Sequence, residues 1–238
     1  MTQWVRRGLL TGIRTTGFPA RPDGAPGVSP GLPLPGALGA EAARAMAARC
    51  PTGAITAVPP GVEIDAGRCV HCYRCADDPD RLSWSAGYEW GASPRHEPPL
   101  TPLGAAFRRS VHILVVDAGD CGACLHEVKQ LNSPYYNMHR LGFFLTPTPR
   151  HADVLLVVGP VTDHMREPLF KAFEAMPAPK RVLAVGACAL SGGVFGPSFV
   201  THAGVAEVLP VDVEVPGQPP PPLAILDGLL LVTGRRAR

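Results

Sequence analysis

The sequence predicts an α/β protein whose second half forms a parallel sheet and whose first half forms a smaller, cysteine-containing α+β domain. Three observations predict this fold. Apolar, β-branched runs alternate with helical patterns from residue 111 onward. The 28 prolines and 26 glycines are frequent in segments that separate the patterned regions. The seven cysteines fall into two groups, one before and one after residue 111.

The sheet is predicted from three mostly apolar segments, typical of strands buried on both faces, and from a weaker fourth segment. These segments are 111–116, 153–158, 181–185 and, as the weaker case, 208–215. Helical patterns lie between and after them, at 124–131, 165–176 and 223–231. Strands that alternate with helices predict a parallel sheet with right-handed crossovers.

The Pro- and Gly-rich stretches set the expected domain limits. We expect an extended N-terminal arm over 1–39, a small domain over 40–90, a linker over 91–110 and the sheet domain over 111–238. A short helix over 40–49 leads into the first cysteine. Pro-rich arms commonly become ordered against another subunit, so the sequence favours a component of a larger complex.

Cys50, Cys69, Cys72 and Cys75 make one complete iron–sulfur site. The bacterial ferredoxin run is C-x2-C-x2-C-x3-C-P, and its last cysteine ligates the other cluster of a two-cluster protein. Cys69, Cys72 and Cys75 begin one run, and Cys50, followed by Pro51, closes the other. Thiolates suit iron–sulfur clusters, so we predict a [4Fe–4S] cluster here. The alternatives are a zinc knuckle, which more often uses two C-x2-C pairs, and disulfides, which a chain without a signal-peptide pattern disfavours.

The four ligands of the partner ferredoxin cluster are missing. Counted back from Cys50, its first three ligands would stand at Ala40, Ala43 and Met46, and its fourth at Pro79. One site has lost every ligand and the other has lost none. This pattern predicts a single-cluster ferredoxin-like domain.

A second group, Cys121, Cys124, Cys188 and Gln218, follows the ends of predicted strands. Cys121 and Cys124 come after the first strand, Cys188 after the third and Gln218 after the fourth. Open α/β sheets bind their ligands beyond the carboxyl ends of strands, so we predict a second, incomplete cluster site. A thioredoxin-like pair of Cys121 and Cys124 is the alternative, which the position of Cys188 disfavours.

The segment from about residue 111 to 234 closely resembles the B subunit of NADH-quinone oxidoreductase. It resembles still more closely the small subunits of membrane-bound, energy-converting [NiFe] hydrogenases and formate hydrogenlyases. The matching stretches are 117–127, 149–157, 159–162, 179–180, 186–195 and 210–213. The opening Trp4 to Leu9 is similar to the start of a ferredoxin-like subunit of these systems. The chain thus looks like a fusion of two subunits that are usually separate.

This resemblance implies a flavodoxin-like domain that carries a proximal [4Fe–4S] cluster. In the family the cluster faces the nickel–iron site of a large subunit or, in complex I, the quinone pocket. The resemblance makes Cys121, Cys124 and Cys188 three of the cluster ligands. It also aligns Glu127 with an acidic residue associated with proton transfer at the boundary between the subunits.

Gln218 is the departure from the family, which has Pro-Gly-Cys-Pro-Pro where this chain has Pro-Gly-Gln-Pro-Pro. An amide oxygen is a hard donor and a poor match for cluster iron. Four outcomes are open: a [3Fe–4S] cluster, a [4Fe–4S] cluster whose fourth iron takes water, Gln218 or a partner's group, an empty site, or a sequence error. His126 and His151 are further candidate ligands by residue type alone.

These features predict an electron-transfer subunit of an oxidoreductase that is not catalytic alone. The expected partners are a hydrogenase-like or complex I-like large subunit, membrane subunits of the same complex, and a ferredoxin or formate dehydrogenase-type donor. One alternative is a scaffold subunit whose second site is empty or altered. Another is a sensor whose open iron position binds a small molecule.

The charge balance and the lengths of the apolar runs bear on two further kinds of partner, nucleic acid and the membrane. With 22 basic and 20 acidic residues, the chain shows no nucleic-acid footprint. No apolar run approaches the roughly 20 residues that span a bilayer. We therefore expect a cytoplasmic protein that is peripheral to the inner face of the membrane and attached through its partners.

Overall fold

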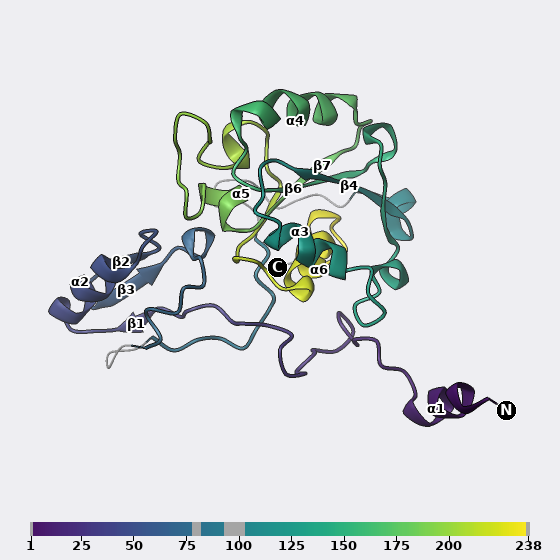
Figure 1. The fold of residues 1–238 in the computed structure, drawn as a ribbon, viewed down its shortest axis with the longest axis horizontal. Coiled ribbons are helices and arrows are strands. Elements are labelled where there is room, and N and C mark those ends of the chain that lie inside the picture. Colours follow the sequence, from purple (N-terminus) through teal and green to yellow (C-terminus); the bar gives the residue numbers. More distant parts are fainter. Residues whose placement is uncertain (1, 78–81, 93–102, 237–238) are drawn as a thin grey trace.

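The computed structural model describes residues 2–77, 82–92 and 103–236, and residues 103–236 contain a five-stranded parallel sheet (Figure 1). Its strands are β4 Val111–Asp117, β5 Phe143–Leu145, β6 Val154–Val158, β7 Arg181–Val185 and β8 Val213–Val215. Their order is β5-β4-β6-β7-β8, and every pair is parallel. Numbered along the chain this is the 2-1-3-4-5 order of flavodoxin-like folds, so the fold predicted for the sheet domain is confirmed.

Helices cover both faces of this sheet. They are α3 Ala123–Gln130, α4 Asp163–Ala175, α5 Ala187–Ser191 and α6 Pro222–Val232. Figure 1 shows α4 on one face and α3 with α6 on the other. Leu155 and Val157 of β6 pack on the α4 side, whereas Val154 and Leu156 pack on the α3 and α6 side. Alternation along a strand that is buried on both faces explains its continuous apolar run.

The four strands predicted from apolar runs are all present, but the weakest is shorter than expected. Residues 205–207 form a 3-10 turn, and β8 begins only at Val213. Strand β5 was not predicted, because three residues at the sheet edge give no pattern. Helix α5 was not predicted either, since five residues are too short to show helical periodicity. The remaining 3-10 turns are Ala66–Arg68, Ala105–Arg108, Met138–Leu141 and Pro149–His151.

The first half of the chain contains a small α+β unit. Its elements are β1 Gly36–Ala37, α2 Ala40–Arg49, β2 Ile55–Val58 and β3 Gly61–Ile64, and the antiparallel strands lie in the order β1-β3-β2. Ala43 and Met46, which stand where a partner cluster would be ligated, pack in the core with Ile55 and Val62. Apolar side chains therefore occupy two of the positions at which a two-cluster ferredoxin would have cysteine ligands. Position 79 lies outside the described residues.

The N-terminal arm packs against both later parts of the chain. Its Phe18 is only 1% exposed and makes an edge contact with Tyr88, with ring centroids 5.3 Å apart. The Thr16 N–H donates to the carbonyl of Tyr135 at 2.9 Å. The arm begins with a helix that was not predicted, α1 Gln3–Thr11, which stands away from the body in Figure 1. The predicted arm and domain limits stay predictions, and most of the proposed linker lies outside the described residues.

The two halves of the chain meet along the edge strand β8 and helix α5. Ala92 and Glu214 exchange backbone hydrogen bonds of 3.0 and 2.8 Å. The Ser191 hydroxyl of α5 donates to the carbonyl of Gly67 at 3.0 Å. This contact brings the cysteine-containing loop of the small unit to the carboxyl edge of the parallel sheet.

Within the described ranges, no helix combines the length and apolar character needed to cross a membrane. The most apolar helix, α6, has 11 residues and is buried along its whole length.

Candidate iron–sulfur sites

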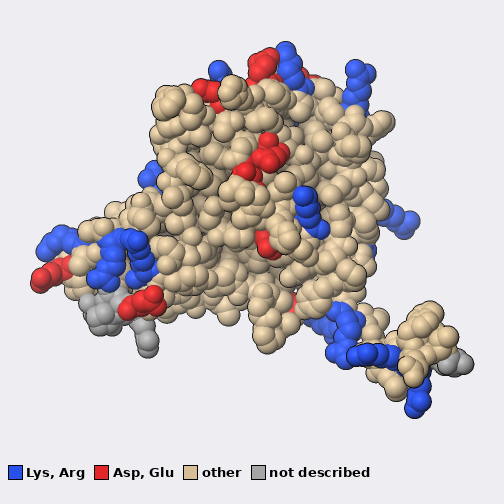
Figure 2. Space-filling view, in the orientation of Figure 1, with Lys and Arg blue, Asp and Glu red and all other residues tan. Residues whose placement is uncertain are grey.

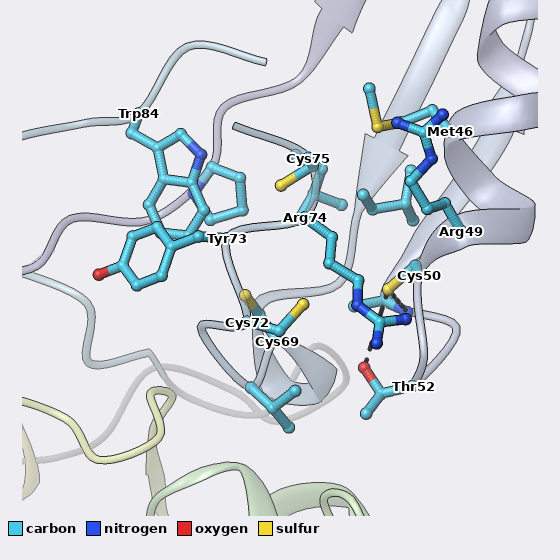
Figure 3. Close-up of a pocket in the computed structure, with 15 residues that line it drawn as sticks. Met46, Arg49, Cys50, Thr52, Cys69, Cys72, Tyr73, Arg74, Cys75 and Trp84 are labelled. Carbon is cyan, nitrogen blue, oxygen red and sulfur yellow. Dashed lines mark hydrogen bonds between the residues drawn. The ribbon is translucent and has the colours of Figure 1, made fainter. Parts of the chain in front are cut away.

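The first site is a pocket that all four cysteines of the first group line (Figure 3). Cys50 follows the end of α2, and Cys69 follows the 3-10 turn Ala66–Arg68. Figure 3 shows the four sulfur atoms facing the same space. The structure therefore brings together the four residues that the ferredoxin run predicted.

The loop from Cys69 to Cys75 reaches this arrangement through an unusual backbone. Two of its residues, His71 and Tyr73, have left-handed conformations, with φ of 50° and 59°. Residues other than glycine adopt this region rarely, and such conformations concentrate at binding sites. The tight curl lets one short loop present three thiols to the pocket.

Burial and mutual proximity shape the chemistry of these thiols. Burial, with a smaller contribution from the neighbouring Cys75, Cys50 and Cys72, raises the pKa of Cys69 to about 11. Burial also raises the pKa of Cys75, while the neighbouring indole of Trp84 partly offsets this effect. The Ala54 N–H donates to the Cys50 sulfur at 3.2 Å. A bound cation or cluster would relieve the repulsion among four thiolates.

The surroundings of the Trp84 indole N–H show whether a cluster would fit this pocket. Its indole N–H is buried in the pocket wall beside the Cys75 thiol and, among the described residues, makes no hydrogen bond of regular geometry. An unpaired buried N–H costs free energy, so such groups in native structures call for an acceptor. The sulfur atoms of a cluster in this pocket would supply one. Four thiols and one buried N–H beside them therefore fit an iron–sulfur cluster.

The second site gathers the other three cysteines and Gln218 at the carboxyl edge of the parallel sheet. Cys124 lies in the first turn of α3 and Cys188 in the first turn of α5, and both are buried. Cys121 is exposed just before α3. Burial raises the pKa of Cys124, and the nearby Asp120, Cys188 and Cys121 add to this rise. The predicted second group is thus close in space.

Gln218 lies at the fourth corner of this site. Its amide nitrogen is 3.5 Å and its amide oxygen 3.7 Å from the Cys188 sulfur. Burial raises the pKa of Cys188, and the contact with Gln218 partly offsets that rise. The loop that was expected to carry a fourth cysteine thus puts an amide beside Cys188.

Two glycines make room for the cysteines of the second site. Gly186 has a φ of 94°, and a Cβ there would lie 2.5 Å from the Cys124 sulfur. Gly193 has a φ of 59°, and a Cβ there would lie 2.6 Å from the Cys188 sulfur. Any side chain would push a sulfur out of place. The backbone is thus shaped around the thiols, which supports a fit to a cluster at this site too.

Replacing Gly186 by alanine is expected to displace Cys124 and to lower the iron content of the second site. We also expect the free energy of unfolding to fall by about 1–3 kcal/mol through backbone strain and the sulfur contact. Gly104→Ala is the matched control, because Gly104 has a φ of 95° and open space around its added Cβ. Iron content and chemical denaturation of both variants check this. Equal iron loss in both variants would show that Gly186 is not needed to make room for the Cys124 sulfur.

Glu127 and Asp120 are the acidic groups of the second site. Glu127 is half-buried one turn after Cys124, and burial raises its pKa. Asp120 was not predicted. One of its oxygens accepts the N–H groups of Gly122 and Leu125 at 3.0 Å, and the other is buried without a hydrogen-bond partner among the described residues. An acidic residue three positions before the first residue of a helix was the available signal.

The two histidines considered as further ligands are both exposed. His126 is exposed on α3 and contacts Gln130 at 3.2 Å. His151 is exposed just before β6, at the amino end of the sheet, whereas the cysteines lie at the carboxyl end. His151 is therefore not placed to join the three cysteines, whereas His126, two residues after Cys124 on α3, stays an untested candidate.

All seven cysteines lie in described segments, and all are free thiols. Across those segments, no three His, Cys, Asp or Glu side chains form a group that could hold a single metal ion.

Comparisons with known proteins identify the family. The family model of the "NADH ubiquinone oxidoreductase, 20 Kd subunit" matches residues 121–232. The probable membrane-bound hydrogenase subunit mbhJ of Pyrococcus furiosus is 41% identical over 144 residues, which cover 60% of this chain and 86% of that protein.

Two further relatives agree. The NADH-quinone oxidoreductase B subunit of Heliobacterium modesticaldum is 41% identical over 134 residues, covering 55% of this chain and 76% of that protein. Formate hydrogenlyase subunit 7 of Escherichia coli K12 is 40% identical over 128 residues, covering 54% of this chain and 50% of that protein. The chain thus spans about half the length of this last relative. It belongs to the NADH ubiquinone oxidoreductase 20 kDa subunit family, as its motifs predicted, and is an electron-transfer subunit of an oxidoreductase.

Proposed function

We propose that this protein relays electrons through two iron–sulfur sites, between a donor and the catalytic large subunit of a hydrogenase-like or complex I-like oxidoreductase. The observation that carries the proposal is the contact between two elements that neighbour the two cysteine groups. The 3-10 turn before Cys69 touches α5, which holds Cys188, through the bond between Gly67 and Ser191. Two redox sites on facing elements of one chain are suited to a relay.

For the first site we propose a [4Fe–4S] cluster held by Cys50, Cys69, Cys72 and Cys75. Such a cluster, when bound, supplies one-electron transfer at a potential set by hydrogen bonding and exposure. The protein buries Cys69 and Cys75 and leaves Cys72 exposed. The apolar pocket wall excludes water, and the N–H of Ala54 steadies the Cys50 sulfur. These features favour a bound cluster whose net charge is low.

For the second site we propose a cluster held by Cys121, Cys124 and Cys188, with Gln218 at its fourth corner. Three thiolates suit cluster iron, and the Gln218 amide is a weak fourth donor. We therefore propose that one iron is readily lost here, so that a [4Fe–4S] and a [3Fe–4S] form interconvert. Glu127 is proposed to hold a proton at the boundary with the large subunit, because burial keeps its pKa above the usual range.

The exposed apolar loop after α5 is proposed as the docking surface for the large subunit. Val194, Phe195 and Phe199 are 63%, 68% and 93% exposed. Apolar patches of this kind mark interaction sites. Figure 2 shows basic side chains over the small unit and near α1, with a mostly uncharged surface over the sheet domain. Membrane subunits and a ferredoxin or formate dehydrogenase-type donor are proposed as the other partners, with peripheral attachment at the inner face of the membrane.

A scaffold function is the second candidate, and the contact between Gln218 and Cys188 favours it. The Gln218 amide gives the Cys188 thiol a hydrogen-bond partner even when no cluster is bound. In this case only the first site would be redox active, and the sheet domain would serve to dock the large subunit.

Electron paramagnetic resonance of the anaerobically purified protein, before and after dithionite, separates the two candidates. The relay predicts two distinct signals, one of which responds to substitutions of the second group of cysteines. The scaffold predicts one signal, which responds only to substitutions of the first group.

Replacing Trp84 by phenylalanine is expected to lower the reduction potential of the first site. The indole N–H stabilises the more negative, reduced state, and its loss favours oxidation. One hydrogen bond of about 1.4 kcal/mol corresponds to roughly 60 mV for a one-electron couple. Redox titration monitored by electron paramagnetic resonance checks this. Trp90→Phe is the control, since Trp90 also has a buried, unpaired N–H but does not line the pocket. Equal potentials in the wild type and Trp84→Phe would contradict the expectation.

A further inference from the structure

His71 belongs to the loop of the first site, but its ring reaches the second site. The backbone N–H of Gln218 donates to Nδ1 of His71 at 3.1 Å. The Nε2 atom of His71 lies 2.9 Å from the carbonyl oxygen of Gly31. Because Nδ1 accepts a hydrogen bond, the ring proton must be on Nε2, which donates to Gly31. One neutral imidazole therefore ties the fourth corner of the second site to the N-terminal arm.

Two indole rings contact the ring of His71 and hold it in this orientation. It stacks on Trp90, with centroids 5.7 Å apart and an interplanar angle of 25°. Trp84 contacts it at 5.8 Å with an angle of 54°. Trp90 is only 8% exposed. A clamped ring with both nitrogens bonded is a fixed support for the Gln218 backbone.

The hydrogen bond from His71 ends at Gln218, whose side chain lies at the second site. The Gln218 side chain contacts the Cys188 sulfur through both its amide atoms. Holding the backbone of a residue limits the directions that its side chain can take. The position of the Gln218 amide therefore depends on the hydrogen bond to His71.

We propose that His71 is the positioning residue that couples the two sites, since it holds the Gln218 backbone and so directs the Gln218 side chain at Cys188. The loop that supplies three thiols to the first site thereby sets the fourth corner of the second site. This inference rests on the proposed function for its effect on a cluster. The hydrogen bond itself can be tested independently of any cluster.

Two substitutions separate the two hydrogen bonds of the ring. His71→Asn keeps an acceptor close to the position of Nδ1 and loses the donor to Gly31. Asparagine also tolerates the left-handed backbone at this position. His71→Gln has a longer side chain, so its amide reaches toward Gly31 and leaves the Gln218 N–H without an acceptor. The proposal predicts that only the second substitution disturbs the second site.

Hydrogen exchange gives a readout that needs no cluster. Residues 219–222 are all proline and have no amide hydrogens, so a peptide over 216–222 reports on Gly217 and Gln218. We expect exchange to be roughly tenfold faster in His71→Gln and unchanged in His71→Asn. A peptide over β6 serves as the control for global unfolding.

Electron paramagnetic resonance of the second site is the companion readout. Its signal in His71→Asn is expected to match that of the wild type, whereas in His71→Gln it is expected to shift or broaden at equal iron content. Unchanged exchange and unchanged signal in His71→Gln would overturn the proposal. If that variant does not fold, loss of Gln218 protection in His71→Asn with β6 still protected would overturn it. A missing second signal in the wild type would overturn the proposed function, and the exchange result would still decide the hydrogen bond.

Discussion

Replacing Cys69 by serine is expected to remove about four irons per chain and the associated first-site signal, because a cubane needs four soft ligands. The small unit should also lose stability. Its core of six buried residues is small, and compact units of this size depend on bound groups. We expect a loss above about 2.7 kcal/mol, the contribution of a ligand at a hundred times its dissociation constant. Iron analysis and chemical denaturation measure both effects.

Cys188→Ser is the matched control for this substitution, since it also replaces a buried cysteine. It is expected to leave the first-site signal intact and to change only the second. Retention of full iron and an unaltered signal in Cys69→Ser would show that Cys69 is not a ligand. Loss of the same signal in both variants would show that the two groups do not form separate sites.

Replacing Gln218 by cysteine is expected to complete the second site and to stabilise its fourth iron. In the wild type, oxidation in air should produce a three-iron signal, because the amide donor at the fourth corner holds iron weakly. In the variant this signal should disappear and the iron content should rise by about one per chain. The contacts of Gln218 with Cys188 put this position beside the second site. Electron paramagnetic resonance with iron analysis measures this change.

Gln3→Cys is the control for the added thiol, because Gln3 is exposed on α1, away from both sites. It should give the wild-type signals. A three-iron signal of equal size in Gln218→Cys would show that Gln218 does not stand at an iron corner. An iron content that rises by about four only in Gln218→Cys would favour the scaffold candidate, in which the wild-type site is empty.

The sheet could be predicted from sequence because its central strands are buried on both faces. The runs at 111–116, 153–158 and 181–185 have no alternation, and each became a strand of the predicted sheet. Strand β5 and helix α5 could not be predicted, because contacts with neighbouring elements stabilise them and their own residues show no regular pattern. The packing of Phe18 against Tyr88 joins residues far apart in the sequence and left no local signal.

The cysteine groups could be predicted because ligand spacing reflects cluster geometry. The structure brings each group together, although the ligands themselves stay a prediction. Trp84, Asp120 and His71 were missed, since a donor or a support for a site has no fixed spacing from the ligands. His71 was hidden within the cysteine motif, where it reads as a spacer residue. Its bond to Gln218 spans 147 positions and becomes visible only in three dimensions.

The most direct test of the relay is the amount of iron and acid-labile sulfide per chain in the anaerobically purified full-length protein. Two filled sites predict about eight irons, or about seven where the Gln218 corner has lost its metal. A value near four, with a signal that responds only to Cys50, Cys69, Cys72 and Cys75, would contradict the relay. It would mean a single redox site joined to a docking domain.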